Sequence, residues 1–186
     1  MHTQDDQSLP WFALYVKPKH EKTVTTLLGG KGLETFLPTY RRHHKRSKHF
    51  DLPLFPGYVF CRCESSKMLP VVSTPGVFLI VGNGRTPEPI SEVEIGNIRR
   101  MIGSGTDPCP WPYVAEGNEV CVTSGPLRGL QGLMVDTSQE KWLVVSLNLL
   151  RRSVAVKLDR DSIVVDSSAN ESAAQPYVLS ATGMAR

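Results

Sequence analysis

The chain has 186 residues and a formal net charge of +3, a length that suits one domain or two small ones. Its content of 40% hydrophobic and 21% charged residues is typical of a globular, soluble protein. No apolar run approaches the roughly 20 residues that a membrane span needs. The polar, acidic start MHTQDDQSLP also lacks the pattern of a secretory signal. We therefore expect a cytoplasmic protein.

Positive charge is concentrated in the first part of the chain. Residues 1–102 carry fourteen Lys/Arg and nine Asp/Glu, whereas residues 117–166 carry six of each sign. The surplus equals the charge of one short stretch, called the basic segment below. Its basic residues are Arg41, Arg42, Lys45, Arg46 and Lys48. Such a local positive field is typical of a nucleic-acid contact or of a solvated loop.

Strands and helices are expected to alternate in the first part. Aromatic and β-branched runs predict strands over 11–17, 33–41, 57–63 and 76–82. Apolar residues at helical spacing predict helices over about 19–30, 65–72 and 91–103. The last helix should open with a capping box made of Ser91 and Glu94. This order predicts an α+β domain with an antiparallel sheet flanked by helices.

A Pro- and Gly-rich stretch without periodicity, 103–116, predicts a linker. Five short runs after it predict strands over 118–125, 132–138, 141–148, 153–158 and 161–165. Five strands so close together predict a small SH3-like β-barrel. The expected organisation is a polar leader 1–10, a domain 11–102, the linker, a barrel 117–166 and a disordered tail 167–186.

One turn of the predicted barrel has a specific pattern. Gly125 and Pro126 are expected to form it, since proline presets φ at the second turn position. Gly129 and Gly132 are expected where the chain re-enters the sheet and a Cβ would clash. A glycine-bent hairpin of any small barrel is the alternative. The positions that match a KOW motif are Gly117, Val120, Val122, Gly125, Pro126, Gly129, Gly132 and Val135.

With this turn, the chain resembles the NusG family over residues 11–165. The motifs WFALYVKPKHEKTVTTLL, FLPTY, FPGYVF, PGVFLIVG and PISEVEIGNI occur in the order seen in the family's N-terminal domain. The resemblance implies a bacterial transcription elongation or antitermination factor with an NGN domain followed by a KOW domain. It also implies a monomer that is not an enzyme and that has no cofactor or metal.

In the family, the N-terminal domain binds the clamp of the largest RNA polymerase subunit and suppresses pausing. Exposed aromatic side chains suit such an interface because they dominate binding energy. A place in the core is the alternative for the aromatic residues, and a helix N-cap is the alternative for the serines. The positions that match the polymerase-binding surface are Trp11, Phe55, Pro56, Tyr58, Phe78, Ser65, Ser66 and Lys67.

The basic segment corresponds to a variable loop that lies near upstream or non-template DNA in the family. Its Lys and Arg side chains are expected to contact phosphates in a salt-dependent way, and a solvated loop without a partner is the alternative. His43, His44 and His49 have no Cys or carboxylate partners at ligand spacing, which disfavours a metal site.

The KOW domain recruits Rho or a small-subunit ribosomal protein in the family. Its contact loop usually has an exposed Phe before a Gly-Arg pair, but Leu150 stands at the Phe position and Arg151 replaces the glycine. This departure makes Rho less suitable as a partner and indicates a specialised paralog similar to RfaH or to regulators of exopolysaccharide operons. The expected partner-binding residues are Leu149, Leu150, Arg151 and Arg152.

Other classes of protein fit the sequence less well. The four cysteines, Cys61, Cys63, Cys109 and Cys121, form no C-x-x-C pair and are expected to be small buried or half-buried thiols. No nucleophile–base set or phosphate-binding loop supports an enzyme. A ribosome-associated RNA-binding KOW protein is the main alternative, although its barrel should be strongly basic.

Overall fold

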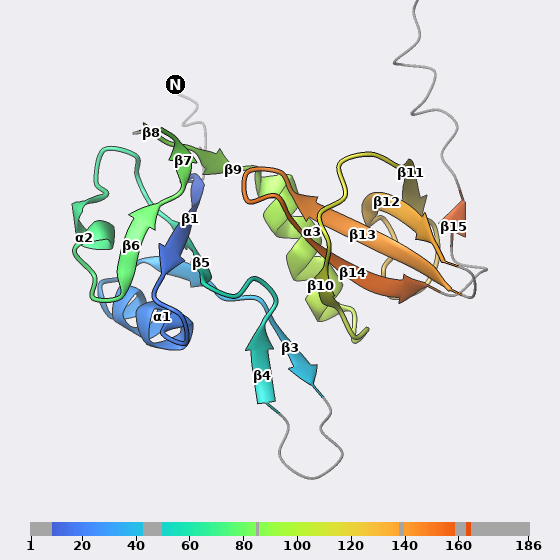
Figure 1. Ribbon diagram of the computed structural model, residues 1–186, viewed down its shortest axis with the longest axis horizontal. Coiled ribbons are helices and arrows are strands. Elements are labelled where there is room, and N and C mark those ends of the chain that lie inside the picture. Colours follow the sequence, from blue (N-terminus) through green and yellow to red (C-terminus); the bar gives the residue numbers. More distant parts are fainter. Residues whose placement is uncertain (1–8, 43–49, 85, 138–139, 159–162, 165–186) are drawn as a thin grey trace, which may run out of the picture.

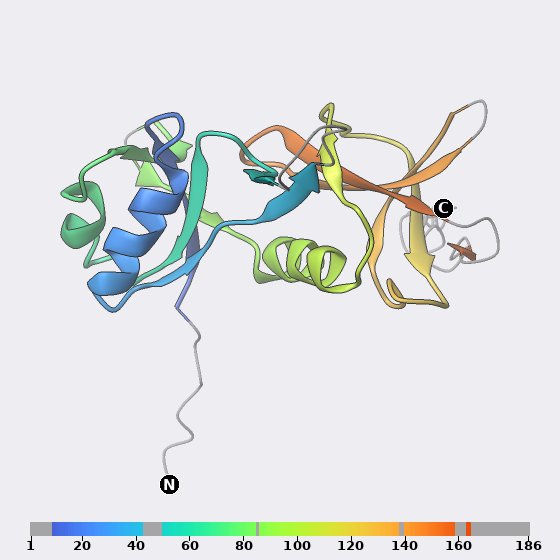
Figure 2. The same ribbon diagram turned by 90° about the horizontal axis from the view of Figure 1, so that it is seen from below.

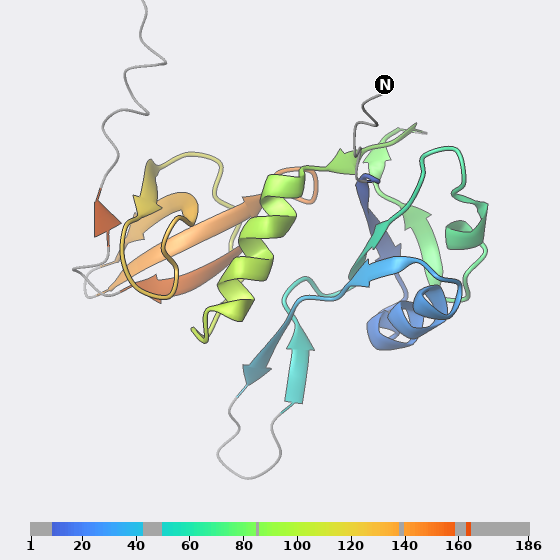
Figure 3. The ribbon, with the colours of Figure 1, turned by 180° about the vertical axis from the view of Figure 1, so that it is seen from behind.

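The computed structural model describes residues 9–42, 50–84, 86–137, 140–158 and 163–164. Two sheets lie side by side, and a long helix lies between them along the second sheet (Figures 1, 2 and 3). Below, the first domain comprises the elements from β1 to α3, and the second comprises those from β10 to β15. Within the described residues, no helix is long and apolar enough to cross a membrane.

The first sheet is antiparallel and has the order β2-β5-β1-β6, with β9 also paired to β1. Its central strand β1 is WFALYV, in which only Tyr15 is exposed. This burial explains why both the odd and the even positions of the strand are apolar. The strands are β1 (Trp11–Val16), β2 (Glu34–Phe36), β5 (Tyr58–Arg62), β6 (Val77–Ile80) and β9 (Pro89–Ile90).

Helices α1 (Glu21–Gly30) and α2 (Leu69–Val72) cover one face of this sheet. Because side chains alternate along a strand, the even positions of β1 point to these helices and the odd positions point to the opposite face. The buried side chains between the sheet and the helices are Phe12, Leu14, Val16, Val24, Leu28, Val59, Cys61, Cys63 and Val71.

The single strand expected over 33–41 is wrong, because the chain forms two strands there. β2 ends at Phe36, and β3 (Thr39–Arg42) leaves the sheet to pair with β4 (Phe50–Pro53). Pro38 has no N–H for a ladder bond, and its carbonyl accepts a bond from Leu54 N at 2.9 Å. The β3–β4 arm projects away from both sheets (Figure 1). β7 (Gly82–Asn83) and β8 (Thr86–Pro87) form a second short hairpin.

Helix α3 (Glu92–Gly103) begins as expected but without the full capping box. Ser91 Oγ accepts a hydrogen bond from Val93 N at 3.2 Å. The Glu94 carboxylate instead accepts bonds from Asn148 of the second domain. The alternative that Ser65 or Ser66 caps α2 is wrong, because this helix starts after Met68 and has no side-chain cap.

The second sheet is antiparallel, with the order β10-β14-β13-β12-β11-β15. β10 lies within the segment expected to be a linker and pairs with β14, where Trp111 stacks on Trp142 at 4.8 Å. This strand was not predicted. The strands are β10 (Cys109–Trp111), β11 (Asn118–Val122), β12 (Gln131–Asp136), β13 (Lys141–Leu147), β14 (Arg152–Leu158) and β15 (Ile163–Val164).

In the glycine turn of the second domain, two positions need glycine for different physical reasons. A Cβ on Gly132 would lie 2.6 Å from the Val144 carbonyl oxygen, which confirms the expected clash. The clash expected at Gly129 is wrong, because a Cβ there would meet nothing within 4 Å, and the glycine is needed instead for its φ of +79°. Val120 and Val122 are buried, as expected.

Candidate functional site

The sequence Phe55-Pro56-Gly57-Tyr58 forms a tight turn at the entry to β5. Tyr58 N donates to Phe55 O at 3.1 Å, and Gly57 has a φ of +83°. Proline followed by a glycine of positive φ is the preferred sequence of a type II turn. The turn is fastened to α1, because Gly57 N donates to the buried Glu21 Oε1 at 2.9 Å.

This turn separates two aromatic rings that were both expected at the surface. Phe55 is only 2% exposed and meets Phe60 edge to face at 5.7 Å. Tyr58 is half-buried and lies 5.6 Å from Tyr15. The structure therefore places Phe55 in the core and Tyr58 at the rim of the sheet, with Pro56 exposed between them.

Tyr58 lies at the edge of a group of exposed large side chains on the face of the sheet opposite α1. Phe78 is 59% exposed and its ring lies 5.6 Å from that of Tyr15. Leu79 pairs with Tyr15 across β1 and β6 and is also exposed. Tyr15 and Leu79 were not predicted, although Tyr15 follows Trp11 and Ala13 in strand alternation and could have been inferred to face their side. The aromatic patch is defined as Tyr15, Tyr58, Phe78 and Leu79.

Trp11 lies on the same face but is completely buried. The guanidinium groups of Arg62 and Arg99 lie over its ring, at 4.8 and 4.7 Å from the centroid. Glu34 pairs with both of these arginines, at 3.2 and 3.0 Å. The core alternative for Trp11 is therefore the one that the structure shows.

Ser65, Ser66 and Lys67 are exposed in the turn before α2. Ser66 Oγ donates to Glu64, and Lys67 Nζ pairs with the same carboxylate at 2.7 Å. The hydrogen bond from Lys67, followed by that from Ser66, lowers the pKa of the Glu64 carboxyl below its ordinary value. The same contact raises the pKa of Lys67, so this exposed pair stays charged at neutral pH.

The basic segment is described only at its start. Arg41 is exposed on the β3–β4 arm and lies 3.8 Å from Asp51, a pair that contributes little to stability. Arg42 ends β3. Outside the described residues lie Lys45, Arg46, Lys48, His43, His44 and His49.

A cavity of about 650 Å³ lies beside the aromatic patch. Tyr15 and Tyr58 line it from the first sheet, and Tyr40 lines it from the β3–β4 arm. The second domain contributes Arg152. The sequence did not predict that this arginine and Tyr58 border one cavity, because each lies in a different domain.

Arg152 belongs to the partner loop, defined as residues 148–152. Leu150 is only 8% exposed, so the expected exposed contact lies in the core. Arg151 is exposed, has a φ of +48° and places its guanidinium 4.8 Å from the Tyr113 ring. Positive φ is the region that glycine tolerates best, so Arg151 adopts a backbone conformation that is unfavourable for its side chain. Leu149 is half-buried.

The cysteines occupy buried or half-buried positions that suit small apolar side chains. Cys61 and Cys63 are buried beneath α1 and α2, while Cys109 and Cys121 are half-buried. The hydrogen bond between Cys61 and Cys63, aided by burial, raises the pKa of Cys61, and the same bond lowers that of Cys63. In the part of the chain that the structure describes, no group of three His, Cys, Asp or Glu residues could hold a metal ion.

Comparisons with known proteins place this geometry in a family. A family profile described as "Transcription termination factor nusG" matches residues 9–99. The transcription termination/antitermination protein NusG of Thermus thermophilus is 29% identical over 181 residues, which span 84% of this chain and 98% of that protein. The NusG protein of Pseudomonas aeruginosa is 33% identical over 110 residues, or 56% of this chain and 62% of that protein.

A solved structure described as "Domain interaction in Thermotoga maritima NusG" has a similar fold. Its TM-score is 0.52 with 22% sequence identity, over 84% of this chain and 97% of that chain. The α+β domain followed by a small antiparallel sheet therefore agrees with the expected fold class. Over most of its length the chain is thus similar to NusG, and it is a NusG-like transcription termination/antitermination factor.

Proposed function

We propose that this protein is an elongation or antitermination factor that binds the clamp of the largest RNA polymerase subunit through the aromatic patch and suppresses pausing. The observation that carries the proposal is the exposure of Tyr15, Phe78 and Leu79 side by side in a NusG-family chain. Adjacent large apolar side chains exposed on a folded domain mark protein-binding surfaces. The type II turn holds Tyr58 in place before binding, which lowers the entropic cost of association.

Retention of the full chain on core RNA polymerase, compared with purified ribosomes, tests this proposal. We expect polymerase to retain the wild type and to lose the Tyr58→Ala/Phe78→Ala variant. Leu27→Ala is the matched control, because Leu27 is an exposed apolar residue on α1, which covers the other face of the sheet. Retention on ribosomes alone would instead support a ribosome-associated RNA-binding protein.

Transcription across a pause site tests the activity itself. The purified protein should shorten the pause, and the Tyr58→Ala/Phe78→Ala variant should not. A wild-type protein that binds polymerase but leaves the pause unchanged would contradict the antipausing role.

Two further contacts complete the proposal for the first domain. Ser65, Ser66 and Lys67, exposed before α2, would touch the opposite side of the polymerase cleft. The basic segment on the β3–β4 arm would contact upstream or non-template DNA through phosphates. In this proposal the protein works as a monomer beside the polymerase, in the cytoplasm.

The second domain, in this proposal, recruits a small-subunit ribosomal protein or Rho through the partner loop. The buried Leu150 and the arginine at position 151 support a specialised paralog of the RfaH or exopolysaccharide-operon type. Transcript profiling after deletion of the gene should then show altered transcript levels from a few long operons. A change across most transcripts would show a general factor.

A further inference from the structure

Helix α2 has few contacts of its own that could fix its orientation. It comprises the four residues Leu69–Val72, and so short a helix is not stable by itself in water. Its start has no side-chain cap. Within it only Val71 is buried, whereas Leu69 is 76% exposed. Contacts from another element must therefore hold this helix against the first domain.

Lys31, the residue that follows α1, supplies such a contact. Its Nζ donates to the Pro70 carbonyl oxygen and to Thr74 Oγ1, both at 2.7 Å. Thr74 is only 2% exposed, and its hydroxyl donates to the same Pro70 carbonyl at 2.8 Å. Carbonyl groups in the last turn of a helix lack intrahelical partners, and a lysine ammonium suits them. These three hydrogen bonds close a set that joins α1 to α2, and we call it the lysine anchor.

The lysine anchor stands behind the turn that the proposed function assigns to the far side of the polymerase cleft. Ser65, Ser66 and Lys67 are all exposed in this turn. Glu64 accepts from Ser66 Oγ and pairs with Lys67, and its carbonyl accepts from Lys67 N at 2.9 Å. These bonds join residues within the turn, so they shape it without fixing its direction. The direction is set where the turn joins β5 and α2.

The opposite end of α1 holds the other proposed contact. Glu21, in the first turn of the helix, is 6% exposed and accepts from Gly57 N at 2.9 Å. Gly57 belongs to the turn that places Tyr58 at the aromatic patch. One helix of ten residues, about 15 Å long, is thus bonded to both surfaces. A rigid connection of this kind fixes their spacing before a partner arrives and lowers the entropic cost of binding.

We infer that Lys31 is a positioning residue, which fixes α2 and the turn 65–67 to α1 so that this turn and the aromatic patch meet one partner together. The inference rests on the proposed function for the identity of that partner. Two contacts on one rigid unit assist each other through a high effective concentration. Loss of the lysine anchor therefore weakens the contact of the turn and leaves the aromatic patch itself unchanged.

Hydrogen exchange of the full chain, followed by mass spectrometry, tests the lysine anchor without any partner. Lys31→Met removes both bonds of the ammonium group and keeps the apolar stem. We expect exchange in residues 64–74 to rise on the order of ten-fold, because a weakly held segment then opens locally. Exchange in residues 55–58 should not change. Lys31→Arg should recover most of the protection, since a guanidinium can donate to the same two acceptors.

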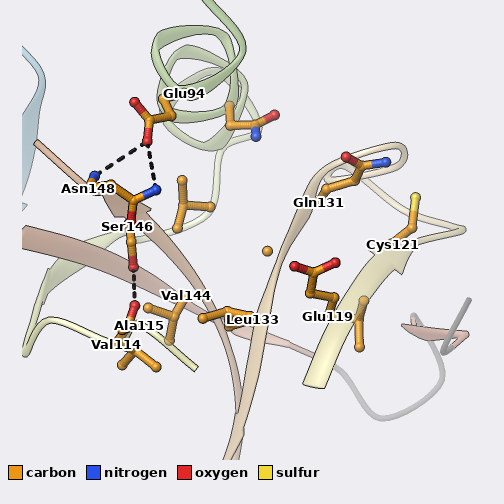
Figure 4. A pocket seen from close by; sticks show the side chains of 14 residues that line it. Glu94, Val114, Ala115, Glu119, Cys121, Gln131, Leu133, Val144, Ser146 and Asn148 are labelled. Carbon is orange, nitrogen blue, oxygen red and sulfur yellow. Dashed lines mark hydrogen bonds between the residues drawn. The ribbon is translucent and has the colours of Figure 1, made fainter. Parts of the chain in front are cut away.

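Ser146→Ala is the matched control, because it also removes two side-chain hydrogen bonds. Ser146 Oγ donates to the Val114 carbonyl at 2.8 Å within the second domain (Figure 4). It shares a second hydrogen bond with Ser153 Oγ at 2.7 Å. Exchange in residues 64–74 should keep its wild-type rate in this variant. Wild-type exchange of residues 64–74 in Lys31→Met, or the same rise in the control, would overturn the lysine anchor.

A double-mutant cycle with core RNA polymerase tests whether the lysine anchor positions the turn. Ser65→Ala/Lys67→Ala should weaken binding of the otherwise wild-type chain by about five-fold, and by less than about two-fold when Lys31→Met is already present. A turn that points in the wrong direction has little contact left to lose. If Lys31 served stability alone, the turn substitutions would cost the same with and without Lys31→Met, and that result would overturn the inference. Thr74→Val removes one acceptor of the anchor and serves as the second variant in the same cycle.

The inference and the proposed function can fail separately. If Tyr58→Ala/Phe78→Ala loses retention on polymerase while Lys31→Met and the turn variant bind like the wild type, the aromatic-patch contact stands and the inference is overturned. If polymerase does not bind the wild type but Lys31→Met raises exchange in residues 64–74, the lysine anchor stands and polymerase is the wrong partner.

Discussion

Phe55 and Tyr58 illustrate how one turn gives neighbouring aromatic residues opposite roles. The type II turn reverses the chain between them, so the Phe55 ring points into the core against Phe60. Tyr58 starts β5 and keeps its ring beside Tyr15 on the open face. A substitution of Phe55 should therefore lower the stability of the fold, whereas a substitution of Tyr58 should weaken binding.

The stability of the two single variants checks this division. Phe55→Ala should lower the free energy of unfolding by about 3–5 kcal/mol, because it leaves a cavity in the core. Tyr58→Ala should cost about 1 kcal/mol and should lose retention on core RNA polymerase. Urea unfolding measures the stability of each variant, and a pull-down measures its retention on polymerase. Equal losses of stability at the two positions would contradict the assignment.

Trp11 is completely buried, and the guanidinium groups of two arginines lie over its ring. Arg62 and Arg99 both lie close to the ring centroid, and Glu34 pairs with both cations. Stacking of a guanidinium on an indole contributes roughly 0.5–1 kcal/mol at a partly exposed site. The residue therefore serves to anchor α3 to the first sheet.

Replacement of Arg99 separates stacking from charge. Arg99→Ala should lower the free energy of unfolding by about 1 kcal/mol, through loss of the stacking and of a partly exposed ion pair. Arg99→Lys keeps the charge but cannot stack as a planar group, so urea unfolding should show only partial recovery. Full recovery with lysine would assign the effect to the ion pair.

Among the elements, α3 and β12 differ in whether a glycine position has room for a Cβ. Gly96 lies in the interior of α3, and a Cβ there would meet nothing within 4 Å. Gly132 lies in β12, where the Val144 carbonyl of the next strand approaches too closely for a Cβ. The same substitution should therefore have opposite signs at the two positions.

Thermal and urea unfolding of the two variants test this contrast. Gly96→Ala should stabilise the protein by about 0.5–1 kcal/mol, because alanine has the higher helix propensity. Gly132→Ala should destabilise it by about 1–3 kcal/mol, because β12 or β13 must shift. A neutral result at Gly132 would show that the second sheet relaxes freely.

The strand β10 extends the second sheet beyond the five strands that the sequence predicts. Its pairing with β14 covers an edge that would otherwise expose unpaired backbone groups. Trp111 stacks on Trp142 and secures it. Because a single tryptophan among prolines shows no strand periodicity, this element could not be found from the local pattern.

At the scale of the whole molecule, the β3–β4 arm and the aromatic patch border the same cavity. Tyr40 of the arm and Tyr58 of the sheet both line it, while Arg41 stands exposed on β3. An apolar surface beside a cationic arm suits a protein partner that itself holds nucleic acid. The arm should then add affinity that depends on salt but not on base sequence.

A salt titration of DNA binding measures this contribution. Arg41→Ser/Arg42→Ser should make the slope of log affinity against log salt shallower by about two, one unit for each lost phosphate contact. Arg128→Ser/Lys157→Ser removes two exposed cations of the second domain and is the control. An unchanged slope in the arm variant, or an equal change in the control, would remove the DNA-contact proposal.

Most elements of this fold follow from local chemistry along the chain. β-branched and aromatic runs form the strands, Ser91 caps α3, and the Pro-Gly pair bends the chain before β5, because each effect involves residues a few positions apart. The burial of Trp11 and Phe55 depends instead on residues brought from other elements. Glu94 shows this most clearly, because its partner Asn148 is 54 positions away. Local patterns were thus sufficient for the strands, helices and family motifs, whereas packing between distant segments decided which motif residues remain exposed to bind a partner.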